Sequence, residues 1–408
     1  MTFHTLSQGS ETPMVAERML QRLMSAEGAR LLSAIRESDP QPASVLSLSR
    51  RMRKEFDPDL VAAALTLHEL RVKAASKFSR ANEMWLTRAG LEQATSESIA
   101  RHRARRYAGL RTVADLCCGI GGDLIALAAG PDSGSILAVD RDRLHLEMAR
   151  ANAELYAVPA EIRPLEADVR DVGLAGVDGV FIDPARRTGR GRTVPGASEP
   201  PLDWCVGLVD RVPAVGIKAA PGIPHDIVPG GWGVEMIALG ADLKEAVLWS
   251  PAMSQLAALA TVIRDDRVHT LEPVPGDPLP IRAPEPGDVF LDPNPAVTRA
   301  GLVEDLARVI GAARIDDRVA FLVSGCFHPT PFARSLRVVA SGPWNEKALR
   351  ARLRELDAGP IDIRRRGLAG DVDAITKRLR MDGTRPFTIA MTRMKDRPWA
   401  VICEEIRA

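Results

Sequence analysis

Acidic side chains and glycines lie close together between Val113 and Ala129, in the sequence VADLCCGIGGDLIALAA. The apolar run that opens this stretch is typical of a buried strand, and the apolar run after the glycines is typical of a helix. Asp115 lies near the end of the strand, and Gly119 and Gly121 lie in the turn. A glycine turn lets the backbone approach a ligand because no Cβ intervenes, and the first N–H groups of the helix point the same way. The stretch therefore predicts a ligand site at the carboxyl end of a strand.

A second acid, Asp140, ends the next apolar run, SILAVD, where a carboxylate can accept both ribose hydroxyls of an adenosine-bearing ligand. The dinucleotide fingerprint is G-x-G-x-x-G/A, but from Gly119 this chain reads G-I-G-G-D-L and has Leu124 at the third glycine position. Asp123 at the start of the helix would repel a pyrophosphate, whereas acids suit a ligand that carries a sulfonium and an ammonium. The pattern favours S-adenosylmethionine and hence a methyltransferase. A dinucleotide enzyme and an α/β core without this site are the alternatives.

Asp168, in EADVRD, follows the third apolar run. An acid at this place can accept a hydrogen bond from the adenine amino group, with Val169 packed on the ring. The alternative is that Asp168 only caps a helix.

FIDPARRTGRG follows the fourth apolar run and places Asp183 and Pro184 at a strand's carboxyl end, beside the expected methyl donor. Asp183 can orient the acceptor or take its proton. Direct displacement at sulfur needs only positioning and an acceptor lone pair, so Asp183 is predicted to orient it, with Pro184 and Arg186 beside it. The loop's arginines can bind nucleic-acid phosphates, or the loop can be simply solvated. They are Arg186, Arg187, Arg190 and Arg192.

Two further arginine-rich segments have the same two interpretations, a basic binding face or a solvated surface. They are Arg101–Arg111 and Arg364–Arg366.

At 408 residues the chain is long enough for two or three domains. Its formal net charge of +1 excludes binding of polyanions by bulk charge, so any nucleic-acid surface must be a local patch. The five cysteines include no C-x-x-C pair, which argues against a disulfide framework and a zinc site, and we predict no metal. No signal sequence or membrane-spanning run is apparent, so we expect a cytoplasmic protein.

The order of apolar runs predicts an α/β protein with a Rossmann-like, seven-stranded core, whose last two strands form a hairpin around Gly240. Residues 1–108 are expected to be helical, with Thr95 as the N-cap of the last helix. Residues 109–265 form the core, and residues 266–288 are a proline-rich linker. Residues 289–408 form a second, smaller α/β domain.

The chain resembles a bacterial family of class I S-adenosylmethionine-dependent methyltransferases that have a THUMP-like C-terminal domain. The residues that carry this resemblance are LTRAGLEQATSESIARHRARR, DLCCGIGGD, DPARR, LKEAVLW, FLDPNPAVTRAGLVEDLA and IRRRGLAGDVDAITKRL. The core is also similar to trimethylguanosine synthases, but Ala185 and Arg186 replace the second proline and the tryptophan of their DPPW motif.

The resemblance implies S-adenosylmethionine as cofactor and, because THUMP domains bind RNA, RNA as substrate. The implied cofactor-site residues are Asp115, Cys117, Gly119, Gly121, Asp140, Asp168 and Asp183, to which we add the neighbouring Arg141 and Val169. Our leading hypothesis is an RNA methyltransferase. The alternatives are a small-molecule or protein methyltransferase, and a non-catalytic RNA-binding protein that keeps the cofactor fold.

Overall fold

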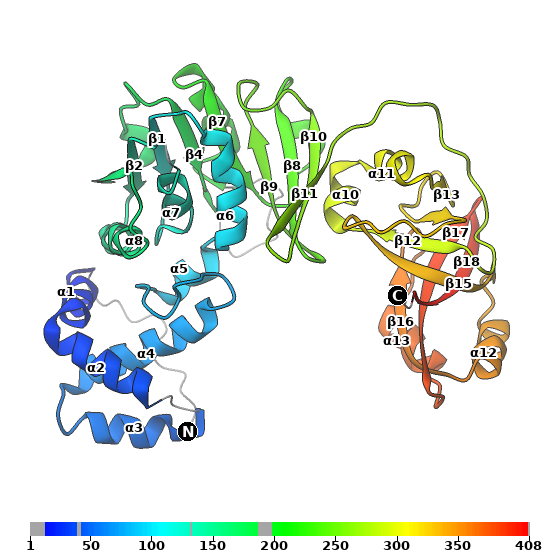
Figure 1. Ribbon diagram of the computed structural model, residues 1–408, viewed down its shortest axis with the longest axis horizontal. Coiled ribbons are helices and arrows are strands. Elements are labelled where there is room, and N and C mark those ends of the chain that lie inside the picture. The colour runs from blue at the N-terminus through cyan, green and yellow to red at the C-terminus, as the bar shows by residue number, and fades with distance from the viewer. Residues whose placement is uncertain (1–12, 39–41, 131–132, 187–197, 407–408) are drawn as a thin grey trace. The chain divides into compact units, whose positions relative to one another are not determined.

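The computed structural model describes residues 13–38, 42–130, 133–186 and 198–406 of the chain (Figure 1). The chain divides into two compact units, Met1–Lys218 and Ala219–Ala408. No helix in the described part is both long and apolar enough to span a bilayer.

Helices occupy most of the described chain before the first strand. The α-helices are α1 Pro13–Met24, α2 Ala26–Glu37, α3 Val45–Met52, α4 Pro58–Ala74, α5 Arg88–Gln93 and α6 Glu97–Ala104, with 3-10 turns η1 Pro42–Ser44 and η2 Arg105–Tyr107. The N-cap of α4 is Asp57, whose side chain accepts hydrogen bonds from the N–H groups of Asp59 and Leu60. The N-cap of α6 is Ser96, so the prediction of Thr95 was wrong. The Thr95 hydroxyl instead binds two charged side chains of the site described below.

Parallel strands follow in the first unit. They are β1 Thr112–Leu116, β2 Ser135–Asp140, β3 Glu161–Glu166, β4 Gly179–Ile182 and β7 Ala214–Ala219, in the order β7-β4-β1-β2-β3. The intervening segments form α7 Gly122–Ala128, α8 Arg143–Leu155, η3 Val169–Asp171, α9 Leu202–Val206 and η4 Gly207–Asp210. A two-stranded hairpin, β5 Ala185–Arg186 and β6 Ser198–Glu199, follows β4. Because β2 and β4 flank β1 on opposite sides, the strand order reverses at β1, which is where open α/β sheets bind ligands.

The second unit begins with four strands in the order β11-β10-β8-β9. They are β8 Gly233–Leu239, β9 Asp242–Trp249, β10 Ala258–Arg264 and β11 Arg267–Leu271, with η5 His225–Ile227 before them. β8 and β9 form the predicted hairpin, with Gly240 in the left-handed region at φ +60°. β10 and β11 were not predicted; β11 uses the first residues of the proline-rich segment and pairs antiparallel with β10.

The C-terminal part of the second unit forms a separate mixed sheet in the order β13-β14-β12-β15-β18-β17-β16 (Figure 1). Its strands are β12 Val289–Pro293, β13 Ala313–Arg314, β14 Leu322–Ser324, β15 Ala333–Pro343, β16 Ala358–Arg365, β17 Arg385–Met394 and β18 Arg397–Glu405. Its helices are α10 Pro295–Ala300, α11 Val303–Ile310, α12 Glu346–Glu355 and α13 Val372–Leu379. The predicted small α/β domain is thus confirmed, but the strands β12, β13 and β15 were not predicted.

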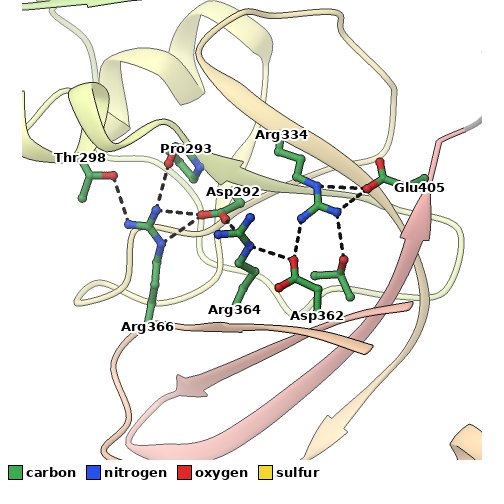
Figure 2. Close-up of polar contacts among 9 residues, drawn as sticks. Asp292, Pro293, Thr298, Arg334, Asp362, Arg364, Arg366 and Glu405 are labelled. Atoms are coloured by element: carbon green, nitrogen blue, oxygen red, sulfur yellow. Dashed lines mark hydrogen bonds and ion pairs between the residues drawn. The ribbon is translucent and has the colours of Figure 1, made fainter. Parts of the chain in front are cut away.

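Charged side chains connect strands of this C-terminal sheet (Figure 2). Arg366 donates to Asp292 at 2.8 Å. The Nε of Arg364 lies 3.1 Å from Asp362 and 3.8 Å from Asp292. Arg334 of β15 also donates to Asp362, at 2.9 Å. Acids of the same domain therefore pair with two of the three arginines in Arg364–Arg366. These arginines link neighbouring segments of the sheet, and the segment is not a free basic face.

Candidate active site

The turn between β1 and α7 consists largely of residues in left-handed conformations. Cys117, Gly119 and Gly121 have φ values of +62°, +52° and +88°. A Cβ on Gly121 would lie 3.0 Å from the Cα of Ala149 in α8, so this glycine is needed for close packing. A Cβ on Gly119 would meet no atom of the described chain within 4 Å. The backbone at Gly119 thus faces open space, as a ligand cradle requires.

Asp140, at the end of β2, ties the turn to the neighbouring strand. Its Oδ2 accepts from the Gly119 N–H at 2.9 Å, and its Oδ1 accepts from the Asp142 N–H at 3.0 Å. A carboxylate has about four acceptor sites, so these two bonds leave capacity for ribose hydroxyls. Arg141, the next residue, is exposed.

Asp115 is fully buried near the end of β1. Within the described part of the chain, neither of its carboxylate oxygens has a hydrogen-bond partner. Burial raises the pKa of Asp115 well above its ordinary value, and the nearby Asp123 and Asp183 raise it further. A buried acceptor without a donor fits a site that receives a cationic or hydrogen-bond-donating ligand.

Asp123, the other acid of the turn, has a different environment. It forms a buried ion pair with Arg103 of α6 and accepts from the Thr95 hydroxyl at 3.2 Å. Arg103 is itself only 2% exposed, and its guanidinium lies 4.5 Å from the Phe181 ring centroid. From the sequence we expected Asp123 to face a cationic ligand, but in the structure Arg103 supplies the positive charge beside it. Arg103 belongs to the core, not to a solvated basic face.

Asp183 follows β4 and faces Lys218 of β7. Lys218 Nζ lies 2.5 Å from Asp183 Oδ2 and 3.0 Å from Thr95 Oγ1. Burial raises the pKa of Asp183, Lys218 lowers it and Asp123 raises it, and the net pKa is above the ordinary value. Lys218 was not among the predicted site residues. Its signal in the sequence is a lysine at the carboxyl end of an otherwise apolar strand, AVGIKA.

Asp168 is the N-cap of η3 and accepts from the Arg170 N–H at 3.0 Å. Its side chain is 40% exposed, with Arg170 Nη1 at 3.4 Å. The capping role is therefore present, and the second oxygen, Oδ2, accepts from the Arg170 guanidinium. Val169 is buried at 6% exposure.

The segment after Asp183 is described only in part. Pro184 is buried, and the backbone of Arg186 pairs with Ser198 in the β5–β6 hairpin. Arg187, Arg190 and Arg192 lie outside the described residues, as does the side chain of Arg186.

These residues fit a methyl donor of the S-adenosylmethionine type on three grounds: open space at Gly119, a buried acid without a donor at Asp115, and acceptor capacity at Asp140. No cluster of three or more metal-ligating side chains occurs in the described part. A Rossmann-like sheet with this turn and these acids at its switch point defines a class I methyltransferase.

Comparisons with known proteins support that class. Residues 110–192 match the family model of RNA cap guanine-N2 methyltransferases, residues 333–405 match the THUMP domain-like family, and residues 18–74 match a domain of unknown function. A crystal structure of a Porphyromonas gingivalis W83 protein, assigned as a methyltransferase, has a TM-score of 0.68. It is 17% identical and covers 90% of this chain and 100% of its own. At that identity the match shows the fold.

Two curated relatives are described as uncharacterized S-adenosylmethionine-dependent methyltransferases of Mycobacterium tuberculosis, from strains CDC 1551 and H37Rv. Each is 37% identical over 324 residues, which cover 76% of this chain and 85% of the relative. The chain belongs to this family: it is an S-adenosylmethionine-dependent methyltransferase with a THUMP-like C-terminal domain, and S-adenosylmethionine is its cofactor.

Proposed function

We propose that this methyltransferase acts on RNA. The observation that carries the proposal is the charge of the THUMP-like stretch. Residues 333–405 contain sixteen lysines and arginines against ten acids, a net charge of +6, whereas the whole chain has a net charge of +1. An excess of positive charge in one domain favours the binding of a polyanion there. The match of the core to a family of RNA methyltransferases supports the same substrate.

We further propose that different parts of the chain have different roles. Residues 109–265 carry out methyl transfer, and residues 1–108 and 289–408 hold the RNA, with residues 266–288 between them. The cofactor contacts are assigned to the predicted set, which is Asp115, Cys117, Gly119, Gly121, Asp140, Arg141, Asp168, Val169 and Asp183. The stiff Asp183-Pro184 turn and Arg186 are assigned to the acceptor.

When bound, S-adenosylmethionine supplies an electrophilic methyl group, which the acceptor's lone pair takes while the S–C electron pair stays on sulfur. The protein's contribution is to hold the two reactants in line. Asp140 fixes the turn through Gly119. In this proposal the Asp183 carboxylate accepts a hydrogen bond from the acceptor and thereby aims its lone pair. The proton that the acceptor loses passes to water.

The test is to incubate the protein with isotopically labelled S-adenosylmethionine and total RNA from a strain that lacks the gene. Mass spectrometry of the digested RNA should reveal one labelled nucleoside, which also identifies the acceptor atom. Asp140→Ala is the matched negative control. RNA binding should weaken steeply with salt, since phosphate contacts release counterions. Label that enters protein or small molecules but not RNA would refute the proposal, as would RNA affinity that does not change with salt.

A further inference from the structure

The carboxyl ends of β4 and β7 hold an ion pair next to the site of methyl transfer. We propose that Lys218 is a positioning residue for methyl transfer, whose ammonium keeps the Asp183 carboxylate ionised and in a fixed orientation toward the acceptor. The proposal rests on the proposed function in one respect, because it requires Asp183 to contact the acceptor.

Sheet register brings the two side chains together. β4 and β7 are parallel neighbours in which Ile182 is opposite Ile217. Asp183 and Lys218 each follow this pair by one residue, so both lie at the carboxyl ends of neighbouring strands, and Nζ lies 2.5 Å from Oδ2. Their side chains are 27% and 15% exposed, which leaves the carboxylate open on one side while the lysine is largely enclosed. A charge-assisted hydrogen bond of this kind is strong when it is partly shielded from water.

A second hydrogen bond also fixes the Lys218 side chain. Its ammonium donates to the Thr95 hydroxyl at 3.0 Å, and that hydroxyl donates to Asp123 at 3.2 Å. Asp123 in turn pairs with the buried Arg103. A continuous series of polar contacts therefore runs from α6 to Asp183, and it restricts the rotamers of Lys218 to those that reach the carboxylate.

The surroundings of Asp183 make a cation necessary there. The ionisable groups that face it come from β1, the glycine turn, α7, α6 and β7; they are Asp115, Cys117, Asp123, Arg103 and Lys218. Burial and Asp123 raise the pKa of Asp183, while Lys218 and Arg103 lower it. Arg103 pairs with Asp123, and among the side chains that the structure describes Lys218 is the cation in direct contact with Asp183. A protonated Asp183 would carry an O–H donor that can bind the acceptor's lone pair, and that lone pair would then point at Asp183 and not at the methyl group.

The first test measures Asp183 directly. Protein labelled with ¹³C at the aspartate carboxyls is titrated by NMR, with Asp183→Asn to assign the signal. Removing an adjacent opposite charge moves a carboxyl pKa by about 1–3 units, so Lys218→Met should raise the pKa of Asp183 by that amount. Lys218→Arg should leave it near the wild-type position. An unchanged titration in Lys218→Met would overturn the proposal. So would a wild-type Asp183 that is protonated at neutral pH, and that result does not require the Lys218 variants to fold.

The second test is the pH profile of methyl transfer to total RNA from the gene-deleted strain. The acid limb of the kcat profile should move to higher pH in Lys218→Met by the pKa shift that NMR measures, and Lys218→Arg should restore the wild-type limb. A loss of activity that is equal at every pH would indicate a structural role only and would overturn the proposal. If the wild type methylates no RNA, the proposed function fails, whereas the NMR titration still decides the role of Lys218.

Discussion

The buried ion pair between Arg103 and Asp123 gives the sharpest stability prediction. Arg103 and Asp123 side chains are 2% and 11% exposed, so neither charge is hydrated to a useful extent. Arg103→Met keeps most of the apolar contact with Phe181 but leaves the Asp123 charge buried without its counter-ion. Removal of one partner of a buried pair destabilises a protein by about 3–5 kcal/mol. In a unit of this size, each kcal/mol of destabilisation lowers the melting temperature by about 2–4 °C, so the melting temperature should fall by about 6–20 °C.

The assay is thermal unfolding followed by circular dichroism, with urea unfolding as the second measurement. Arg105→Met is the matched control, because Arg105 follows the same helix and is exposed, and it should change stability by about 0.5 kcal/mol or less. Arg103→Met combined with Asp123→Asn should recover part of the lost stability, since the double variant no longer buries the unpaired Asp123 charge. A single variant that melts within about 2 °C of the wild type would refute this account, as would a double variant no more stable than the single one.

Three further results are expected. Gly121→Ala should lower the free energy of unfolding in urea by about 1–3 kcal/mol, because φ is +88° and the new Cβ would lie 3.0 Å from the Ala149 backbone; an unchanged midpoint would contradict the packing described. The pKa of Glu97 is net lowered, because hydrogen bonds from Ser79 and Tyr156 outweigh burial, so its stabilisation is present above its ordinary value of 4.5 and is lost as pH falls through the lowered value. Glu97→Gln should therefore be less stable than the wild type by about 1–3 kcal/mol at pH 7, with a gap that closes in acid; a gap independent of pH would oppose this. Iodoacetamide at neutral pH should modify the exposed Cys326 well before Cys117, whose thiol pKa is raised by burial; mass spectrometry that finds Cys117 modified first would contradict its placement.

The parallel core was predictable because its strands are short apolar runs with clear boundaries. TVADLC, SILAVD and GVFID are buried on both faces, and each is followed by a helix or turn signal. The acids that end these strands were visible for the same reason. β15 was missed because ARSLRVVASGP mixes arginines, serines and glycine, and its burial is only partial. Such a strand is specified by its partners β12 and β18 and not by its own pattern.

Parts of the site depend on contacts that no local pattern encodes. Thr95 has the residue type of an N-cap, but its hydroxyl lies between Asp123 and Lys218, which are distant in the sequence. Arg103 lies in a segment with several exposed arginines, and only packing against Phe181 and Asp123 distinguishes it from its neighbours. Sequence spacing can place a residue at the end of a strand, but the pairing of side chains across strands depends on register and burial.

The most direct measurement of the central claim is an isothermal titration of the purified chain with S-adenosylhomocysteine, the demethylated form of the cofactor. The account predicts saturable binding to the wild type. Binding should be weakened at least about tenfold, or 1.4 kcal/mol, in Asp140→Ala, because the variant loses both the proposed ribose acceptor and the hydrogen bond to Gly119. Circular dichroism should show that the variant remains folded. An absence of binding to the folded wild type, or equal affinity in the folded variant, would contradict the assignment of the cofactor to this turn.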